Sequence, residues 1–73
     1  MKHLYALKVN RINSAGLVDL RIHVLITAVY NLDAESKALE NLKEEVGSQP
    51  GFTFEITDAR RVCMTQNDVY MQV

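Results

Sequence analysis

The chain has 73 residues, enough for one small domain, and a domain of this size buries only about 60% of its unfolded surface. Its composition, 48% hydrophobic and 23% charged, excludes the polar, highly charged makeup of disordered chains. A net charge of −1 gives no overall attraction to nucleic acid, and a single cysteine excludes an internal disulfide. The chain shows neither the apolar stretch of a signal peptide nor that of a membrane helix, which favours a cytoplasmic protein with no membrane partner.

The first two predicted elements form an antiparallel hairpin. Residues 2–9 alternate as a strand. Its faces carry Tyr5, Leu7 and Val9 on one side and Leu4, Ala6 and Lys8 on the other. The following stretch, residues 10–16, contains Asn13, Ser14 and Gly16, which favour tight turns. Because a second strand follows, the turn is expected to connect a hairpin.

The second predicted strand, residues 17–30, has two unlike faces. One row is apolar and is expected to face the core: Val18, Leu20, Ile22, Val24, Ile26, Ala28 and Tyr30. The other row is charged at its start and apolar at its end: Asp19, Arg21, His23, Leu25, Thr27 and Val29. Since this mixed row is neither a regular core face nor a regular solvent face, we expect it to face something outside the monomer.

An amphipathic helix is predicted to start near Asp33, a favourable N-cap, and to stop at Gly47. Its apolar stripe consists of Ala34, Ala38, Leu39, Leu42 and Val46. Residues 31–51 carry five acidic side chains and two lysines, whereas residues 1–30 carry four basic side chains and one aspartate. The folded protein is therefore expected to be bipolar, with a basic hairpin and an acidic helix.

The third predicted strand begins with FTFEIT, residues 52–57, which alternates regularly. The residues after it are expected to form an extension and a short terminal hairpin, or a mobile tail. We therefore predict a single α+β domain over residues 1–64, and a C-terminal strand or flexible tail over residues 65–73.

The order of these elements predicts the fold class. Strand, strand, helix, strand is typical of an α+β domain in which one helix packs on one face of a small, mainly antiparallel sheet of three to four strands. A right-handed crossover places the third strand parallel to the second, with the first between them. The uncovered face is expected to carry Leu4, Ala6, Lys8, Arg21, His23, Leu25, Val29, Thr53 and Glu55.

The sequence contains no recognisable catalytic, cofactor-binding or metal-binding motif. His3, His23 and Cys63 do not have the spacing of metal ligands, and no glycine-rich loop is present that would bind phosphate. Neither a glycine-flanked serine nor a cysteine motif provides a nucleophile. We therefore predict that the protein is not an enzyme and needs no cofactor.

Binding is the class of function that fits best. An interface with another protein is favoured, because apolar side chains of the uncovered face lie beside polar ones; alternatively, the C-terminal segment covers these apolar side chains. The predicted protein-binding residues are Lys8, Arg11, Arg21, His23, Leu25, Arg60 and Arg61. A nucleic-acid partner, with Tyr5 or Tyr70 stacked on a base, is a further alternative, against which the acidic helix counts. So is a homodimeric accessory module that pairs this face with itself.

The stretch VYNLDAESKALENLKEEVGSQPGFTFEITDARRVCM, residues 29–64, combines a strand, an acidic helix, a loop with Pro-Gly, an aromatic strand and two trailing arginines. In this layout, and in size, the chain resembles small bacteriophage host-takeover proteins, most of all the phage-encoded regulators that bind host RNA polymerase. The resemblance implies inhibition of transcription initiation, in some cases with antitermination, in a bacterial cytosol and without a cofactor. Other small phage proteins of similar layout inhibit CRISPR complexes or other host enzymes, and these functions are the alternative.

Overall fold

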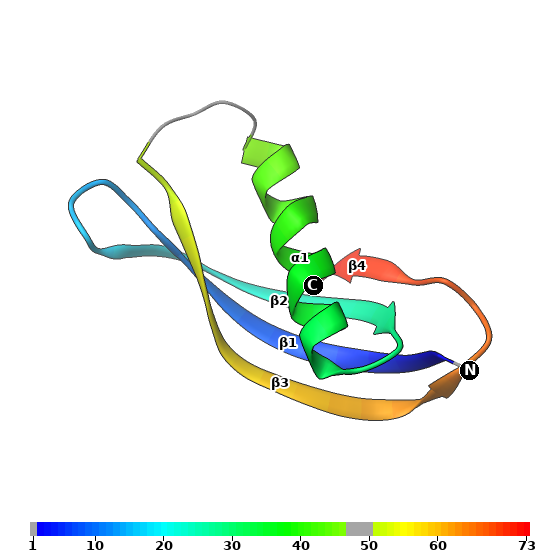
Figure 1. Ribbon diagram of the computed structural model, residues 1–73. Coiled ribbons are helices and arrows are strands. Elements are labelled where there is room, and N and C mark those ends of the chain that lie inside the picture. The colour runs from blue at the N-terminus through cyan, green and yellow to red at the C-terminus, as the bar shows by residue number, and fades with distance from the viewer. Residues whose placement is uncertain (1, 47–50) are drawn as a thin grey trace.

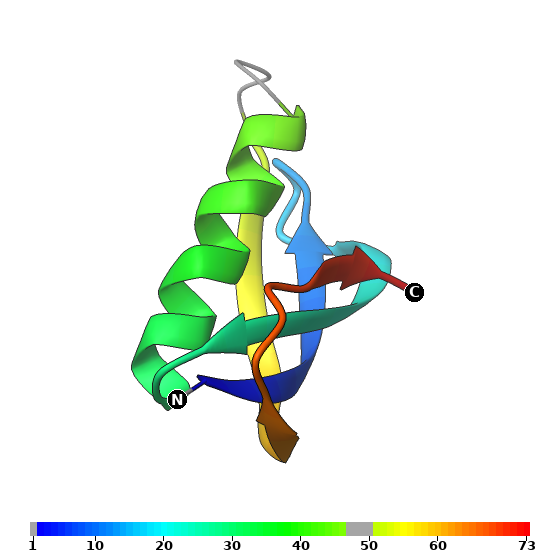
Figure 2. The same ribbon diagram turned by 90° about the vertical axis from the view of Figure 1, so that its right-hand side faces the viewer.

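The computed structural model describes residues 2–46 and 51–73. Its elements in chain order are β1 (Lys2–Ile12), β2 (Val18–Ala28), α1 (Asn31–Val46), β3 (Thr53–Thr65) and β4 (Tyr70–Gln72) (Figure 1). The strands form one antiparallel sheet in the order β3-β1-β2-β4, and the helix lies on one side of it (Figure 2). The predicted α+β fold is confirmed.

The central strand is β1, which pairs antiparallel with both β2 and β3. β2 and β3 are therefore parallel to each other with β1 between them, as the sequence predicted. The terminal hairpin did not form: β4 crosses to the opposite edge of the sheet and pairs with β2, Leu25 opposite Met71. Residues 65–73 thus contain a strand, but its partner is not the strand that precedes it.

The hydrophobic core lies between the sheet and α1. Its ten buried residues come from β1, β2 and α1: Tyr5, Leu7, Val9, Ile22, Val24, Ile26, Ala28, Ala34, Ala38 and Leu42. Two of the three buried helix residues are alanines, whose small side chains allow the helix backbone to approach the sheet closely. Leu39, predicted in the same stripe, is only half-buried at its margin.

The helix begins at Asn31, two residues before the predicted N-cap. The Ala34 N–H donates to the Tyr30 carbonyl (3.0 Å), so Asp33 lies inside the first turn. Its carboxylate accepts a hydrogen bond from the Val29 N–H (3.1 Å) and lies 3.3 Å from Lys37 Nζ. The hydrogen bond and the lysine hold the pKa of Asp33 below its usual value. Gly47, the predicted helix stop, lies outside the described residues.

The β1–β2 hairpin extends beyond the helix. The helix crosses the strands obliquely and does not run along them, so it leaves the loop end of the hairpin uncovered (Figure 1). Val18 and Leu20, predicted to face the core, are consequently 44% and 45% exposed. Tyr30, at the other end of the same row, is also exposed because β2 ends at Ala28. The apolar row therefore reaches the core only over its middle.

The loop of this hairpin has the predicted turn residues. The Asn13 Oδ1 atom accepts hydrogen bonds from the N–H groups of Ala15 (3.0 Å) and Leu17 (3.1 Å). Gly16 has a φ of +79°, a conformation that side chains with a Cβ rarely adopt. These contacts close the loop without any help from the helix.

Candidate protein-binding face

The sheet face opposite α1, called here the open face, has no helix over it (Figures 1 and 2). Residues paired across neighbouring strands share a face, so the register assigns its members. They are Leu4, Ala6, Lys8 and Asn10 of β1, Arg21, His23, Leu25 and Thr27 of β2, Thr53, Glu55, Asp58, Arg60 and Cys63 of β3, and Met71 of β4. The mixed row of β2 therefore lies on the side away from the helix. The C-terminal segment covers this face only at its β2 edge, where β4 joins the sheet and Val73 lies beside the hollow.

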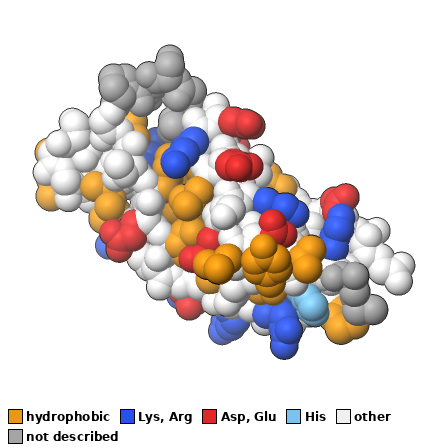
Figure 3. Space-filling model, viewed as in Figure 1, with side chains coloured by type: hydrophobic (Ala, Val, Ile, Leu, Met, Phe, Trp, Pro, Cys, Tyr) orange, Lys and Arg blue, Asp and Glu red, His pale blue; other side chains and the backbone are white. Residues whose placement is uncertain are grey.

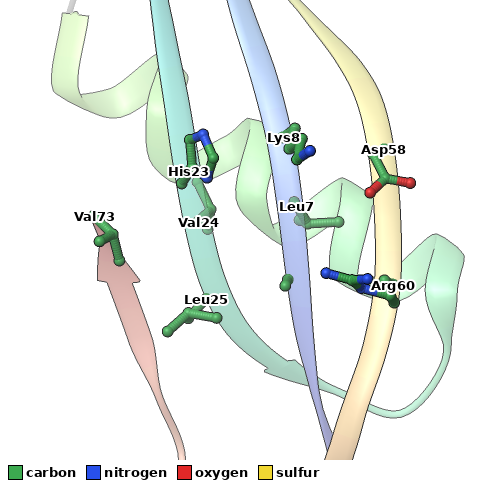
Figure 4. Close-up of a pocket in the computed structure, with 9 residues that line it drawn as sticks. Leu7, Lys8, His23, Val24, Leu25, Asp58, Arg60 and Val73 are labelled. Carbon is green, nitrogen blue, oxygen red and sulfur yellow. The ribbon is translucent and has the colours of Figure 1, made fainter.

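A hollow of about 270 Å³ lies in the middle of the open face (Figure 4). It forms because Ala6, on the central strand, is small, whereas its cross-strand partners Leu25 and Arg60 are long. The other side chains around it are Lys8, His23, Asp58 and Val73. In Figure 4, Arg60 extends from β3 towards β1, and Leu25 extends towards β4. The hollow thus has an apolar side next to β4 and a polar side next to β3.

Within residues 2–46 and 51–73, three cations of the open face have no internal partner, and two of them, Lys8 and Arg60, line the hollow. The ion pairs of the described residues join Lys2 to Asp68, Arg11 to Asp19 and Lys37 to Asp33. In this part of the chain, Lys8, Arg21 and Arg60 form no ion pair, although Asp58 is the cross-strand neighbour of Lys8. Their charges are therefore available to an acidic partner.

Five of the seven predicted binding residues lie together on the open face: Lys8, Arg21, His23, Leu25 and Arg60. The other two, Arg11 and Arg61, lie on the helix side. Arg11 donates to Asp19 (2.9 Å), and its guanidinium lies 4.6 Å from the centre of the Phe52 ring, so it braces the end of the hairpin. Arg61 is paired with Tyr5 of the core row.

The sequence predicted Ala6 on the uncovered face, but it did not point to Asp58 or Val73 as residues around the hollow. Strict alternation from Phe54 and Ile56 assigns Asp58 to the helix side. A β-bulge opposite Lys8 and Val9 shifts the register, so Asp58 moves to the open face and Ala59 packs on the core. No signal in the sequence marks this bulge.

The structure does not favour base stacking on the open face. Tyr5 is 4% exposed and belongs to the core, so the expectation that it stacks on a base is wrong. Tyr70 is paired with Ile26 and therefore lies on the helix side. Within the strands, no Phe or Tyr lies on the open face.

The helix side has the opposite charge character. Acidic side chains gather over the exposed part of the helix, where Glu40, Glu44 and Glu45 are exposed (Figure 3). Hydrophobic side chains gather near the helix start, where Tyr30 and Leu32 are exposed. Helix α1 thus carries five carboxylates and two lysines, whereas the open face carries the unpaired cations Lys8, Arg21 and Arg60 beside the carboxylates of Glu55 and Asp58.

The described residues contain no group of three His, Cys, Asp or Glu side chains arranged to hold a metal ion. Cys63 is a free, exposed thiol on the open face. Over residues 2–46 and 51–73 there is no helix with the length and apolarity that crossing a membrane requires.

Comparison of the chain with protein-family models, with curated proteins and with solved structures found no match.

Proposed function

We propose that this protein is a non-enzymatic regulator that binds a larger protein through its open face. The observation that carries the proposal is a sheet face without a covering layer, where unpaired cations lie beside exposed and half-buried apolar side chains. A face that only met water would carry polar residues throughout. Here Leu25 is half-buried and Met71 is exposed, which is the mixture of apolar centre and polar rim found in interfaces.

We take bacterial RNA polymerase as the partner, with inhibition of initiation as the effect. The support for this choice is the layout shared with phage-encoded regulators of that enzyme. The two-sided charge supports a mechanism: the open face docks on the polymerase while the acidic helix, on the other side of the sheet, points away from the contact. A negatively charged helix held there would repel DNA or block a basic channel that handles it.

Direct binding tests this proposal. The purified protein is immobilised and exposed to nuclease-treated bacterial RNA polymerase, as core enzyme and as holoenzyme, and binding is followed by interferometry. Promoter-dependent transcription with and without the protein gives the functional readout. We expect binding that survives nuclease treatment, together with reduced initiation.

A matched pair of variants locates the contact. Leu25→Glu places a charge on the open face, whereas Leu32→Glu makes the same change at a side chain that is 70% exposed at the helix start. We expect only the first to weaken binding. If the protein binds neither the core enzyme nor the holoenzyme, RNA polymerase is not the partner. If both variants lose affinity equally, the open face is not the contact.

A further inference from the structure

We infer that the hollow around Ala6 is the recognition pocket of the open face, and that it takes an aliphatic side chain of the partner next to a carboxylate. The inference rests on the proposed function and gives the partner's contact segment a chemical character. It follows from the size of the hollow, from the unequal character of its two sides, and from the charges at its rim.

The hollow has an apolar side that suits an aliphatic group. Ala6 and Leu25 are cross-strand partners on β1 and β2, and Val73 follows β4 at the edge. The Val73 N–H donates to the His23 carbonyl (2.8 Å), which holds this residue beside the hollow. A volume of about 270 Å³ is enough for one aliphatic side chain of the partner.

The rim of the hollow selects for one negative charge. Lys8 and Arg60 contribute two permanent cations, and His23 contributes a further nitrogen donor or acceptor. Among the described residues around the hollow, Asp58 has the only side-chain carboxylate, and it is paired in register with Lys8 rather than with Arg60. Arg60 is therefore the cation with the free planar fork that a carboxylate binds in a bidentate manner. The same Asp58 repels a polyanion, so an isolated carboxylate suits the hollow better than a phosphate chain.

The test uses small probes and two-dimensional amide NMR spectra of the intact protein. Hexanoate has an aliphatic body and a carboxylate, hexylammonium has the same body with the opposite charge, and inorganic phosphate has charge without an aliphatic body. We expect hexanoate alone to produce saturable shifts, confined to the amides of residues 6–8, 23–25, 58–60 and 73. Equal shifts with hexylammonium, stronger binding of phosphate, or no shift with hexanoate would each overturn the inference.

Substitutions around the hollow test whether hexanoate binds there. Ala6→Leu fills the hollow from the sheet side and should abolish the hexanoate shifts. Leu25→Ala enlarges it and should weaken hexanoate several-fold, which keeps the test valid if the first variant does not fold. Arg60→Gln should also weaken hexanoate several-fold, whereas Arg61→Gln, the same change on the helix side, should leave it unchanged. Binding that persists in Ala6→Leu with a native spectrum would place hexanoate elsewhere and refute the inference.

Failure here differs from failure of the proposed function. If hexanoate does not bind but Leu25→Glu still prevents docking on the polymerase, the hollow is not the recognition pocket and the open face remains the contact. If hexanoate binds in the hollow and the polymerase does not bind at all, the choice of partner is wrong and the chemistry of the pocket stands.

Discussion

Arg60 and Arg61 are consecutive in β3, yet their side chains lie on opposite sides of the sheet. Arg60 is opposite Ala6 on the open face, and Arg61 is opposite Tyr5 of the core row. Both are exposed, and neither forms an ion pair with the described residues. The two arginines therefore differ in the face that they serve and in little else, which makes them a control for each other.

Charge reversal at these two positions should separate the faces. Arg60→Glu is expected to reduce affinity for the partner protein at least tenfold, because it places a carboxylate where the partner's carboxylate binds. Arg61→Glu should change the affinity by less than about twofold, as is usual for a charge outside the contact. Titration calorimetry with purified RNA polymerase measures both. A larger loss in Arg61→Glu would place the contact on the helix side.

The helix side chains Leu42 and Leu39 should differ in their contribution to stability. Leu42 is 1% exposed between helix and sheet, so Leu42→Ala should lower the free energy of unfolding by about 2–5 kcal/mol. Leu39 is half-buried, and Leu39→Ala should cost less than about 2 kcal/mol because water already reaches the site. Urea unfolding monitored by circular dichroism compares them. Equal costs would mean that the helix is rotated from the orientation described.

Removing the Asp33 carboxylate should make the free energy of unfolding depend less on pH in the acid range. In the folded state, the hydrogen bond from the Val29 N–H and the neighbouring Lys37 lower the pKa of Asp33 below its usual value of 3.8. A carboxyl group whose pKa is lower in the folded than in the unfolded chain stabilises the fold at pH values above its unfolded pKa. This stabilisation is lost as the pH falls through its folded pKa. The Asp33→Asn variant should therefore be less stable than the wild type at neutral pH. As the pH falls below about 4, its stability should decrease less than that of the wild type.

Thermal melts between acid and neutral pH test this behaviour. Glu44→Gln is a suitable control, because it also removes one negative charge from the helix, while the described residues give Glu44 no ion pair. If both variants shift the melting curves alike, the effect comes from net charge and not from the contacts of Asp33.

The buried hydroxyl of Thr27 should hold the C-terminal segment on the sheet. Its Oγ1 accepts a hydrogen bond from the Val69 N–H (3.0 Å), and the Thr27 N–H donates to the Val69 carbonyl (3.0 Å). Thr27→Val keeps the shape but leaves the Val69 N–H without this acceptor, at a cost of about 1–3 kcal/mol. We expect the variant to show faster hydrogen exchange in β4 than the wild type, with a smaller change in β1.

Thr57→Val provides the comparison, since the Thr57 hydroxyl donates to the Lys8 carbonyl (3.2 Å) at an exposed position where water can replace it. Its exchange rates in β4 should remain those of the wild type. Unchanged exchange in Thr27→Val would show that backbone pairing with β2 is enough to retain β4.

The sequence by itself determined the elements and the core row. The alternation of β1 and β2, the helical spacing of Ala34, Ala38 and Leu42, and the turn at Gly16 are local patterns. Each formed near the predicted residues, although the helix begins two residues early and the ends of the core row are exposed. The order of the elements was also enough to place β1 between β2 and β3, since crossover connections have a preferred hand. The mixed row of β2 on the side away from the helix follows from alternation alone.

Only the tertiary structure decided how these elements meet. The bulges in β3 arise from its pairing with β1, so the faces of Asp58, Arg60 and Arg61 depend on a partner strand far away in sequence. The exposure of Val18 and Leu20 depends on where the helix crosses the hairpin (Figure 1). β4 pairs with the edge of β2 that β1 leaves free, next to the hydrogen bond that the Val69 N–H donates to the Thr27 hydroxyl. The hollow around Ala6 forms because the strand register and the position of β4 bring its side chains together.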